Sequence, residues 1–187
     1  MERMYAPWRL AFIKGMEKQT LPSPSGCIFC DYPLPPAGAP VASEVTEAPG
    51  KRREWDRARL ILTGREHCFV ILNKYPYQNG HVMVVPRAHT RELESLSGEA
   101  FMETTMVLRE TIAAVREAYA PHGINVGMNM GRAAGAGIDE HVHWHVVPRW
   151  DGDTNFMPVF SDTRVISEGI DDTWERLAAI LRRPEED

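Results

Sequence analysis

The chain has 187 residues, which fits one domain with a single hydrophobic core. Hydrophobic residues make up 43% of it and charged residues 25%, the composition of an ordinary soluble globular protein, and no apolar run is long enough for a membrane span. The formal net charge of −5 argues against general nucleic-acid binding, while three cysteines without a signal-peptide pattern argue against a disulfide framework and predict a cytoplasmic location.

The first part of the chain is predicted to be an arm, residues 1–54, that contains a CxxC pair. Residues 4–13 are aromatic-rich and predict a short helix or arm packed on the domain or on a partner subunit. Residues 21–26 are rich in Pro, Ser and Gly, which predicts a loop. Residues 31–54 are rich in Pro, Ala and Glu and predict a long flexible excursion, in which the basic run 51–53 is a solvated surface.

Regular structure is expected over residues 55–187. Apolar runs bounded by turn residues predict strands at 60–62, 68–72, 81–85, 124–130 and 141–147. The segment 63–66 suits a hairpin turn, the loop 74–80 contains Pro and Asn-Gly, and Pro86 is expected to end the third strand.

Two helices are expected. Ser97 is a predicted N-cap for a long helix that ends near Pro121, and residues at spacings of three and four form its apolar face: Phe101, Thr105, Leu108, Ile112, Val115 and Tyr119. Residues 171–183 predict a final helix with Trp174, Leu177 and Leu181 on one side. Three strands, a helix, two strands and a last helix predict an antiparallel α+β domain.

The most informative stretch is residues 141–149, HVHWHVVPR. Its alternation of His with apolar residues has the period of a strand, on which His141, His143 and His145 share one face at about 6.7 Å per two-residue step. The alternatives are that these are polar surface residues without a function, or that they form a metal site. Three imidazoles so spaced on a straight strand, however, do not easily converge on one ion. We therefore interpret the set as catalytic.

Cysteines provide a second signal. Cys27 and Cys30 have the two-residue gap of a zinc knuckle, although a redox-active or incidental pair has the same spacing. Cys68 lies inside an apolar run and is expected in the core.

The His alternation resembles the signature of the histidine-triad (HIT) nucleotide hydrolases and transferases. Further matching segments are CIFC at 27–30, FVILN at 69–73, GHVMVVP at 80–86, NMG at 129–131 and AGAG at 134–137. The segments PRW at 148–150 and GDTNFMP at 152–158 resemble the diadenosine tetraphosphate phosphorylase branch. The resemblance implies a HIT-like fold with a five-stranded antiparallel sheet, followed by a C-terminal extension and helix. It also implies a homodimer, formed through the long helix and a neighbouring strand, or a homotetramer.

The same resemblance implies roles for the three histidines. His143 is expected to be the nucleophile that forms a covalent nucleotidyl-histidine, His145 to donate to the α-phosphate, and His141 to give support through a hydrogen bond or a metal. Imidazole suits the nucleophile because its pKa of about 6.5 leaves it largely neutral at pH 7.

Several residues are candidate substrate contacts. Asn73 matches the family position for the ribose hydroxyls, or else caps the following turn. Gly137 stands where many hydrolases of the family have a Gln. The missing side chain leaves space that suits inorganic phosphate; the alternative is that the turn only connects two strands. The remaining candidates are His81 and Trp150, for which structural roles are the alternative, and Asn129, Arg149, Thr154 and Asn155.

By resemblance to bacterial HIT proteins, His89 and His141 complete a structural Cys₂His₂ zinc site with Cys27 and Cys30, and no organic cofactor is expected. The expected activity is phosphorolysis of a dinucleoside polyphosphate, so that diadenosine tetraphosphate and inorganic phosphate give ATP and ADP. The alternatives are a hydrolase or nucleoside phosphoramidase that uses water, and a nucleotide-binding interaction module with little turnover.

Overall fold

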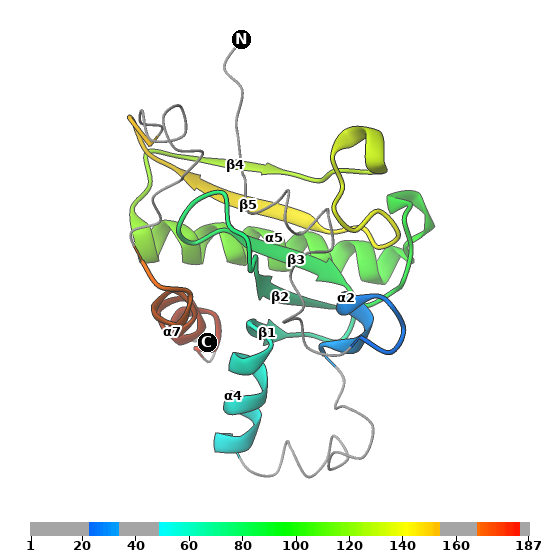
Figure 1. The fold of residues 1–187 in the computed structure, drawn as a ribbon, viewed down its shortest axis with the longest axis horizontal. Coiled ribbons are helices and arrows are strands. Elements are labelled where there is room, and N and C mark those ends of the chain that lie inside the picture. The colour runs from blue at the N-terminus through cyan, green and yellow to red at the C-terminus, as the bar shows by residue number, and fades with distance from the viewer. Residues whose placement is uncertain (1–22, 34–48, 154–167, 184–187) are drawn as a thin grey trace.

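The protein folds around one antiparallel sheet, seen in a computed structural model that describes residues 23–33, 49–153 and 168–183 (Figure 1). The sheet has the strand order β1-β2-β3-β5-β4, and all four pairings are antiparallel. Its strands are β1 (Ile61–Gly64), β2 (Cys68–Leu72), β3 (Val82–Pro86), β4 (Gly123–Gly127) and β5 (Trp144–Arg149). The predicted α+β class and five-stranded sheet are confirmed.

Helices cover the two faces of the sheet unequally. The long helix α5 (Gly98–Tyr119) lies behind the sheet in Figure 1, and the last helix α7 (Ile170–Leu181) packs against α5 and β1. Their core contains Val107, Trp174 and Leu177. The single turn α2 (Ile28–Asp31) lies on the opposite face, where Phe29 packs with Phe69 and other strand residues. Among the described helices, α2 is the one that packs on this second face. None of the helices in the described ranges is both long and apolar enough to cross a bilayer.

The predicted limits of α5 are confirmed, but two of the six residues of its predicted apolar face, Phe101 and Thr105, are exposed. Ser97 Oγ accepts a hydrogen bond from the Ala100 amide at 3.1 Å, as an N-cap does. The side chain of Phe101 is nevertheless 43% exposed, and the buried stripe includes Thr104 and Thr111 instead. Each threonine hydroxyl donates to the carbonyl four residues earlier, which satisfies it inside the helix and makes these polar positions suitable for the core. Apolar side chains are consequently left on the outer surface of α5.

Strand limits also differ from the predictions. Leu60 has φ +60° and stands outside β1, and Pro86 is the last residue of β3 rather than its boundary. Strand β4 ends at Gly127, before the predicted limit at residue 130. Strand β5 begins only at Trp144, so that residues 141–143 precede the strand without regular structure.

The predicted flexible excursion is wrong for residues 49–54, because these belong to helix α4 (Pro49–Ala58). The helix is anchored by Asp56, which is 3% exposed and accepts hydrogen bonds from Arg52 and, at 2.9 Å, from Arg182 after α7. Arg53 pairs with Glu175 of α7. In the basic run, Arg53 therefore links α4 to α7, and Arg52 bonds Asp56 within α4. The predictions for residues 4–13 and 34–48 lie outside the described residues.

Gly80 is expected to be intolerant of a side chain. It has φ +72°, and a Cβ built on it would lie 2.7 Å from Cε2 of Tyr119. We expect Gly80→Ala to lower the free energy of unfolding by about 3 kcal/mol, measured by urea denaturation, because backbone strain and a clash add. Gly131→Ala is the matched control: φ is +79° there, but nothing lies within 4 Å of the added carbon. It should cost about 1 kcal/mol, and equal losses would contradict the tight packing of Gly80 on Tyr119.

Candidate active site and metal centre

Two of the three triad imidazoles share a pocket and the third turns away from it. His143 and His145 line the same pocket, with ring centroids 4.9 Å apart and planes at 74°. His141 is fully buried and its Nδ1 points toward two cysteine sulfurs. The position of His145 is fixed by the strand register, in which it pairs with Met83 of β3 and with Gly127 of β4.

The proton on His143 is placed by a backbone carbonyl. His143 Nδ1 lies 2.8 Å from the carbonyl oxygen of His141. A carbonyl only accepts, so Nδ1 carries the hydrogen and donates it. In the neutral ring the lone pair is then on Nε2, the nitrogen on the other side of the imidazole.

The proton on His145 is placed in the opposite way, through His81. The Tyr77 amide donates to His81 Nδ1 at 3.1 Å, which puts the His81 hydrogen on Nε2. That nitrogen lies 3.0 Å from His145 Nδ1 and donates to it, so neutral His145 carries its own hydrogen on Nε2. The Tyr77 ring stacks on His81 at 5.1 Å and holds its plane. Adjacent rings thus offer a lone pair and a donor, which is what attack on an electrophile with stabilisation of developing negative charge requires.

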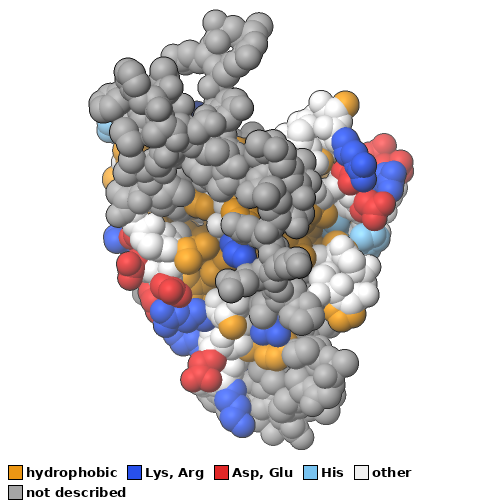
Figure 2. All heavy atoms as spheres, in the orientation of Figure 1, with side chains coloured by type: hydrophobic (Ala, Val, Ile, Leu, Met, Phe, Trp, Pro, Cys, Tyr) orange, Lys and Arg blue, Asp and Glu red, His pale blue; other side chains and the backbone are white. Residues whose placement is uncertain are grey.

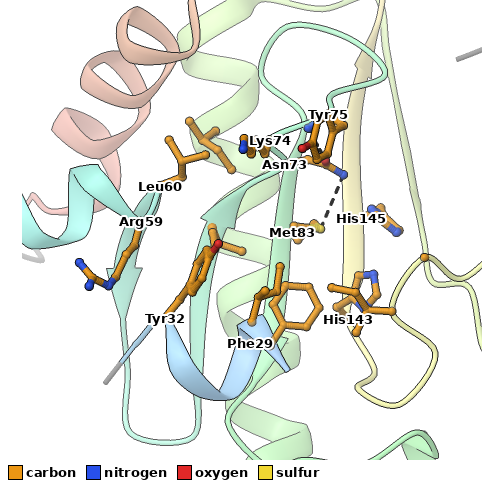
Figure 3. Close-up of a pocket in the computed structure, with 15 residues that line it drawn as sticks. Phe29, Tyr32, Arg59, Leu60, Asn73, Lys74, Tyr75, Met83, His143 and His145 are labelled. Atoms are coloured by element: carbon orange, nitrogen blue, oxygen red, sulfur yellow. Dashed lines mark hydrogen bonds between the residues drawn. The ribbon is translucent and has the colours of Figure 1, made fainter. Parts of the chain in front are cut away.

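A pocket opens beside these two rings, and its walls are mostly apolar (Figure 3). Helix α2, the junction before β1, strands β2 and β3 and the loop after β2 contribute its lining, which includes Ile28, Phe29, Tyr32, Arg59, Leu60, Ile71, Lys74, Met83 and Ile138. In the space-filling view, apolar side chains gather at the centre of this face, and the visible acidic side chains lie toward its margins (Figure 2). The pocket therefore suits a ligand with a flat apolar part and a negatively charged part.

Sequence reasoning found only part of this wall. Phe29, Tyr32, Arg59 and Lys74 come from segments whose pattern gives no sign that they meet the triad. The one usable signal was the position of Phe29 between two candidate metal ligands.

Two predicted substrate contacts, Asn73 and Gly137, lie in the pocket wall. Asn73 Oδ1 accepts a hydrogen bond from the Tyr75 amide at 2.9 Å, so this residue does cap the following turn, and it faces the pocket as well. Gly137 is exposed at the wall, next to Ile138.

The other predicted contacts are placed elsewhere. Arg149 donates to both oxygens of Asp153, at 2.6 and 3.0 Å, and to Asn125, and the guanidinium holds the pKa of the Asp153 carboxyl far below its usual range. Trp150 meets Tyr119 edge to face at 6.4 Å beside a separate cavity. His81 stands behind His145, and Asn129 is half-buried outside the described pocket lining. Thr154 and Asn155 lie outside the described residues.

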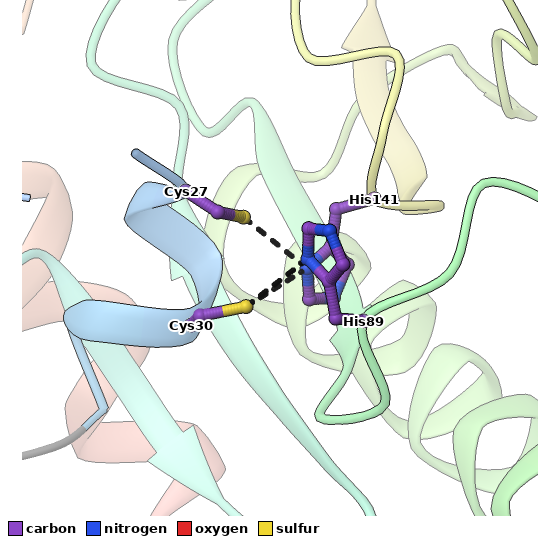
Figure 4. Close-up of side chains that lie close together, drawn as sticks. All are labelled: Cys27, Cys30, His89 and His141. Atoms are coloured by element: carbon purple, nitrogen blue, oxygen red, sulfur yellow. Dashed lines mark hydrogen bonds between the residues drawn. The ribbon is translucent and has the colours of Figure 1, made fainter. Parts of the chain in front are cut away.

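Four predicted metal ligands converge at the edge of the pocket, as Figure 4 shows. Their ligand atoms all lie within 4.8 Å of one another: Cys27 Sγ, Cys30 Sγ, His89 Nδ1 and His141 Nδ1. Sulfur-to-nitrogen distances are 3.2 Å from Cys30 to His89, and 3.4 and 3.6 Å from Cys27 and Cys30 to His141. His141 Nε2 donates to the Pro86 carbonyl at 2.8 Å, so the lone pair on Nδ1 faces the sulfurs. These residues form a candidate metal site.

Comparisons with known proteins agree with this geometry. The family model for the HIT domain matches residues 56–152. A curated relative, the AP-4-A phosphorylase of Mycobacterium tuberculosis, is 33% identical over 178 residues, which cover 95% of this chain and 83% of the relative. A Zn-bound histidine-triad protein from Mycobacterium smegmatis has 27% identity and a TM-score of 0.53, covering 65% of this chain and 83% of that one. The histidine-triad nucleotide-binding protein ST2152 of Sulfolobus tokodaii has 27% identity and a TM-score of 0.52, covering 66% of this chain and 80% of that one. With this sheet, these histidines and these relatives, the chain belongs to the histidine-triad (HIT) family.

Proposed function

We propose that the protein is a nucleotidyltransferase that cleaves dinucleoside polyphosphates by phosphorolysis. The observation that carries the proposal is the opposite placement of protons on two adjacent imidazoles, His143 and His145. The name of the M. tuberculosis relative, AP-4-A phosphorylase, supports diadenosine tetraphosphate as the substrate. The products would then be ATP and ADP.

In the first step, Nε2 of His143 attacks the α-phosphorus of one nucleotide. A nitrogen–phosphorus bond forms, the bridging phosphorus–oxygen bond breaks, and ATP leaves with the electron pair. The His143 ring becomes positively charged, and its Nδ1–H bond to the His141 carbonyl strengthens, which stabilises that charge. The Nε2–H of His145 donates to an α-phosphate oxygen as negative charge develops there.

In the second step, an oxygen of inorganic phosphate attacks the adenylyl group and releases His143 with its lone pair, giving ADP. Gly137 supports this choice of acceptor, since it offers no side chain at the exposed pocket wall and leaves space for a tetrahedral anion. Water as the acceptor would make the protein a hydrolase or a phosphoramidase, and the products distinguish these cases.

The apolar wall supports a nucleoside as the bound group. Phe29 and Ile71 offer surface for a base, while Asn73 stands at the end of β2 where its amide can reach ribose hydroxyls. Burial of a planar base between apolar side chains contributes affinity, and the few polar groups fix its orientation.

Trapping the covalent intermediate tests this proposal. Base-labelled diadenosine tetraphosphate is mixed with the enzyme without phosphate, and the reaction is quenched in alkaline denaturant, because phosphorus–nitrogen bonds are labile in acid. The expected result is label on the peptide that contains His143. Turnover without any labelled peptide would contradict a nucleotidyl-histidine, and absence of both turnover and label would favour the interaction module.

We also propose that Cys27, Cys30, His89 and His141 bind one structural zinc ion. Bonds of about 2.0–2.3 Å in a tetrahedral zinc site give ligand separations of about 3.5 Å, close to the sulfur–nitrogen distances here. Burial is the main cause, and the neighbouring Cys27 the second, that raises the pKa of the Cys30 thiol to about 12. A bound divalent cation offsets the cost of forming the thiolates. The M. smegmatis neighbour described as Zn-bound supports the same choice.

Metal analysis of protein purified without chelator checks the zinc proposal. We expect about one equivalent of zinc per chain, and less than about a tenth would contradict it. Cys30→Ser should lose most of the metal, while Cys68→Ser, at a buried cysteine in β2, serves as the matched control and should retain it.

A homodimer is the oligomer that we propose. The outer surface of α5 carries exposed Phe101, Met102 and Met106, and Val126 and Met130 are exposed in and beyond the edge strand β4. Exposed apolar side chains beside a strand edge are typical of an interface between subunits. Sedimentation should give twice the chain mass, and a monomer at micromolar concentration would contradict the proposal.

A further inference from the structure

Helix α2 belongs to the candidate metal site and to the nucleotide pocket at once. Cys27 is its N-cap and Cys30 lies within it, so two of the four metal ligands flank a single helical turn. Ile28 and Phe29, between these cysteines, line the pocket, as does Tyr32 immediately after the helix (Figure 3).

Phe29 makes the most direct connection between the two sites. Its side chain is 1% exposed, and its ring centroid lies 5.4 Å from that of His141 and 4.9 Å from that of His143. His141 is a candidate metal ligand and His143 the proposed nucleophile. A shift of Phe29 therefore changes the pocket wall and the surroundings of the nucleophile together.

Helix α2 is attached to the sheet by apolar packing, with Phe29 at its centre, and by the contacts of its two cysteines. A single helical turn is unstable alone, and α2 has no side-chain N-cap bond. Within the described part of the chain, the backbone groups of residues 27–32 bond one another, and the backbone of Cys27 also bonds the Ser25 hydroxyl. Ser23 and Ser25 bond Asp31, which closes the local loop but does not reach the sheet. The contacts of Cys27 and Cys30 with His89 and His141 join this turn to two distant segments of the chain.

We infer that metal occupancy at these four residues sets the affinity of the pocket for a nucleoside, with α2 as the coupled element. With the metal bound, both cysteines hold the turn against the sheet and its side chains complete the wall. Without it, the two cysteines no longer share a ligand with His89 and His141, the turn is held less firmly, and part of the wall is lost. The inference rests on the proposed nucleotide function. It also requires reciprocity: a nucleotide that favours the seated turn raises metal affinity by the same factor.

Binding of AMP to the full chain tests the coupling without any turnover. We expect calorimetry to give an AMP Kd about tenfold higher for the metal-stripped protein than for the zinc-loaded one. In the reverse direction, saturating AMP should lower the zinc Kd about tenfold, measured by competition with a chromophoric chelator. Circular dichroism of the stripped protein reports whether the sheet remains folded.

Matched variants separate the metal from other causes. His89 is exposed and absent from the described pocket lining, so His89→Ala weakens metal binding without touching the nucleotide. The AMP Kd of this variant should be raised at limiting zinc and should return to normal at high zinc. The variant tests the coupling even if the fully stripped protein unfolds. His122→Ala, at another exposed histidine, should change neither affinity.

Two further measurements test the route through α2. Inorganic tripolyphosphate has no base to meet the wall, so its affinity should change less than about twofold on metal removal. In Phe29→Ala the metal effect on AMP should likewise fall below about twofold, because the coupled wall is already lost. Three results would each overturn the inference while leaving the nucleotide function intact. They are equal AMP affinity with and without zinc, an undiminished effect of zinc on AMP affinity in Phe29→Ala, and a loss of tripolyphosphate affinity on metal removal equal to that of AMP. Failure of AMP to bind the zinc-loaded protein would overturn both.

Discussion

Replacing His143 with Ala is expected to lower kcat for diadenosine tetraphosphate by about 10⁴-fold or more, the scale on which enzymes lose rate with their nucleophile. The reason lies in the two neighbouring rings. His143 is the one whose Nδ1 proton is fixed by a carbonyl, which leaves the lone pair on Nε2. His145 is held in the other form by His81, so it cannot take over the attack without reversing the His81–His145 bond and breaking the bond from the Tyr77 amide.

The variant should remain folded, because the His143 side chain bonds a neighbouring carbonyl and contacts the rings of Phe29 and His145 at the pocket, outside the main core between the sheet and α5. Its midpoint of thermal unfolding should stay within about 5 °C of the unmodified protein. His122→Ala, at an exposed histidine paired with Asp151, is the control and should retain full activity. More than a few per cent of normal turnover in His143→Ala would remove the nucleophile assignment.

Trp174→Ala is expected to have the largest effect on stability, a loss of about 4 kcal/mol in the free energy of unfolding. Trp174 is fully buried between α7 and the sheet, and its Nε1 donates to the Ile61 carbonyl at 2.9 Å. The guanidinium groups of Arg53 and Arg182 lie 5.1 and 5.2 Å from its ring. Truncation opens a cavity, leaves the carbonyl without its indole donor and loosens the arginines that link α4 with α7.

Trp55→Ala is the matched control for that loss. Trp55 is only half-buried, on α4, with the Arg59 guanidinium over its ring. Its removal should cost about 1 kcal/mol by urea denaturation, since most of the lost contact is at the surface. Similar losses in both variants would contradict the view that α7 is fixed through Trp174.

Most of the fold could be predicted from local patterns, because apolar runs, turns and an N-cap are local properties. The two main errors have different causes, one local and one long-range. The buried stripe of α5 depends on threonine hydroxyls that bond within the helix, and α4 is held by Asp56 with Arg52 and Arg182, partners up to 126 residues apart. Composition does not reveal such pairs, so residues 49–54 resembled a solvated excursion.

The candidate site was predictable where chemistry follows spacing. The His alternation placed His143 and His145 together, and the family resemblance supplied the four metal ligands, which the structure brings within 4.8 Å. The pocket wall was not predictable, since Phe29 and Tyr32 reach it across a long stretch of sequence. Proton positions on the imidazoles were equally hidden, because they depend on the His141 carbonyl, the Tyr77 amide and His81.

Product analysis with diadenosine tetraphosphate tests the central claim most directly. The enzyme is incubated with the dinucleotide in the presence and absence of inorganic phosphate, and nucleotides are separated and quantified. Phosphorolysis through His143 predicts equal amounts of ATP and ADP, formed only when phosphate is present. Equal amounts of ATP and AMP at the same rate without phosphate would contradict it, because water would then be the acceptor at the pocket beside Gly137.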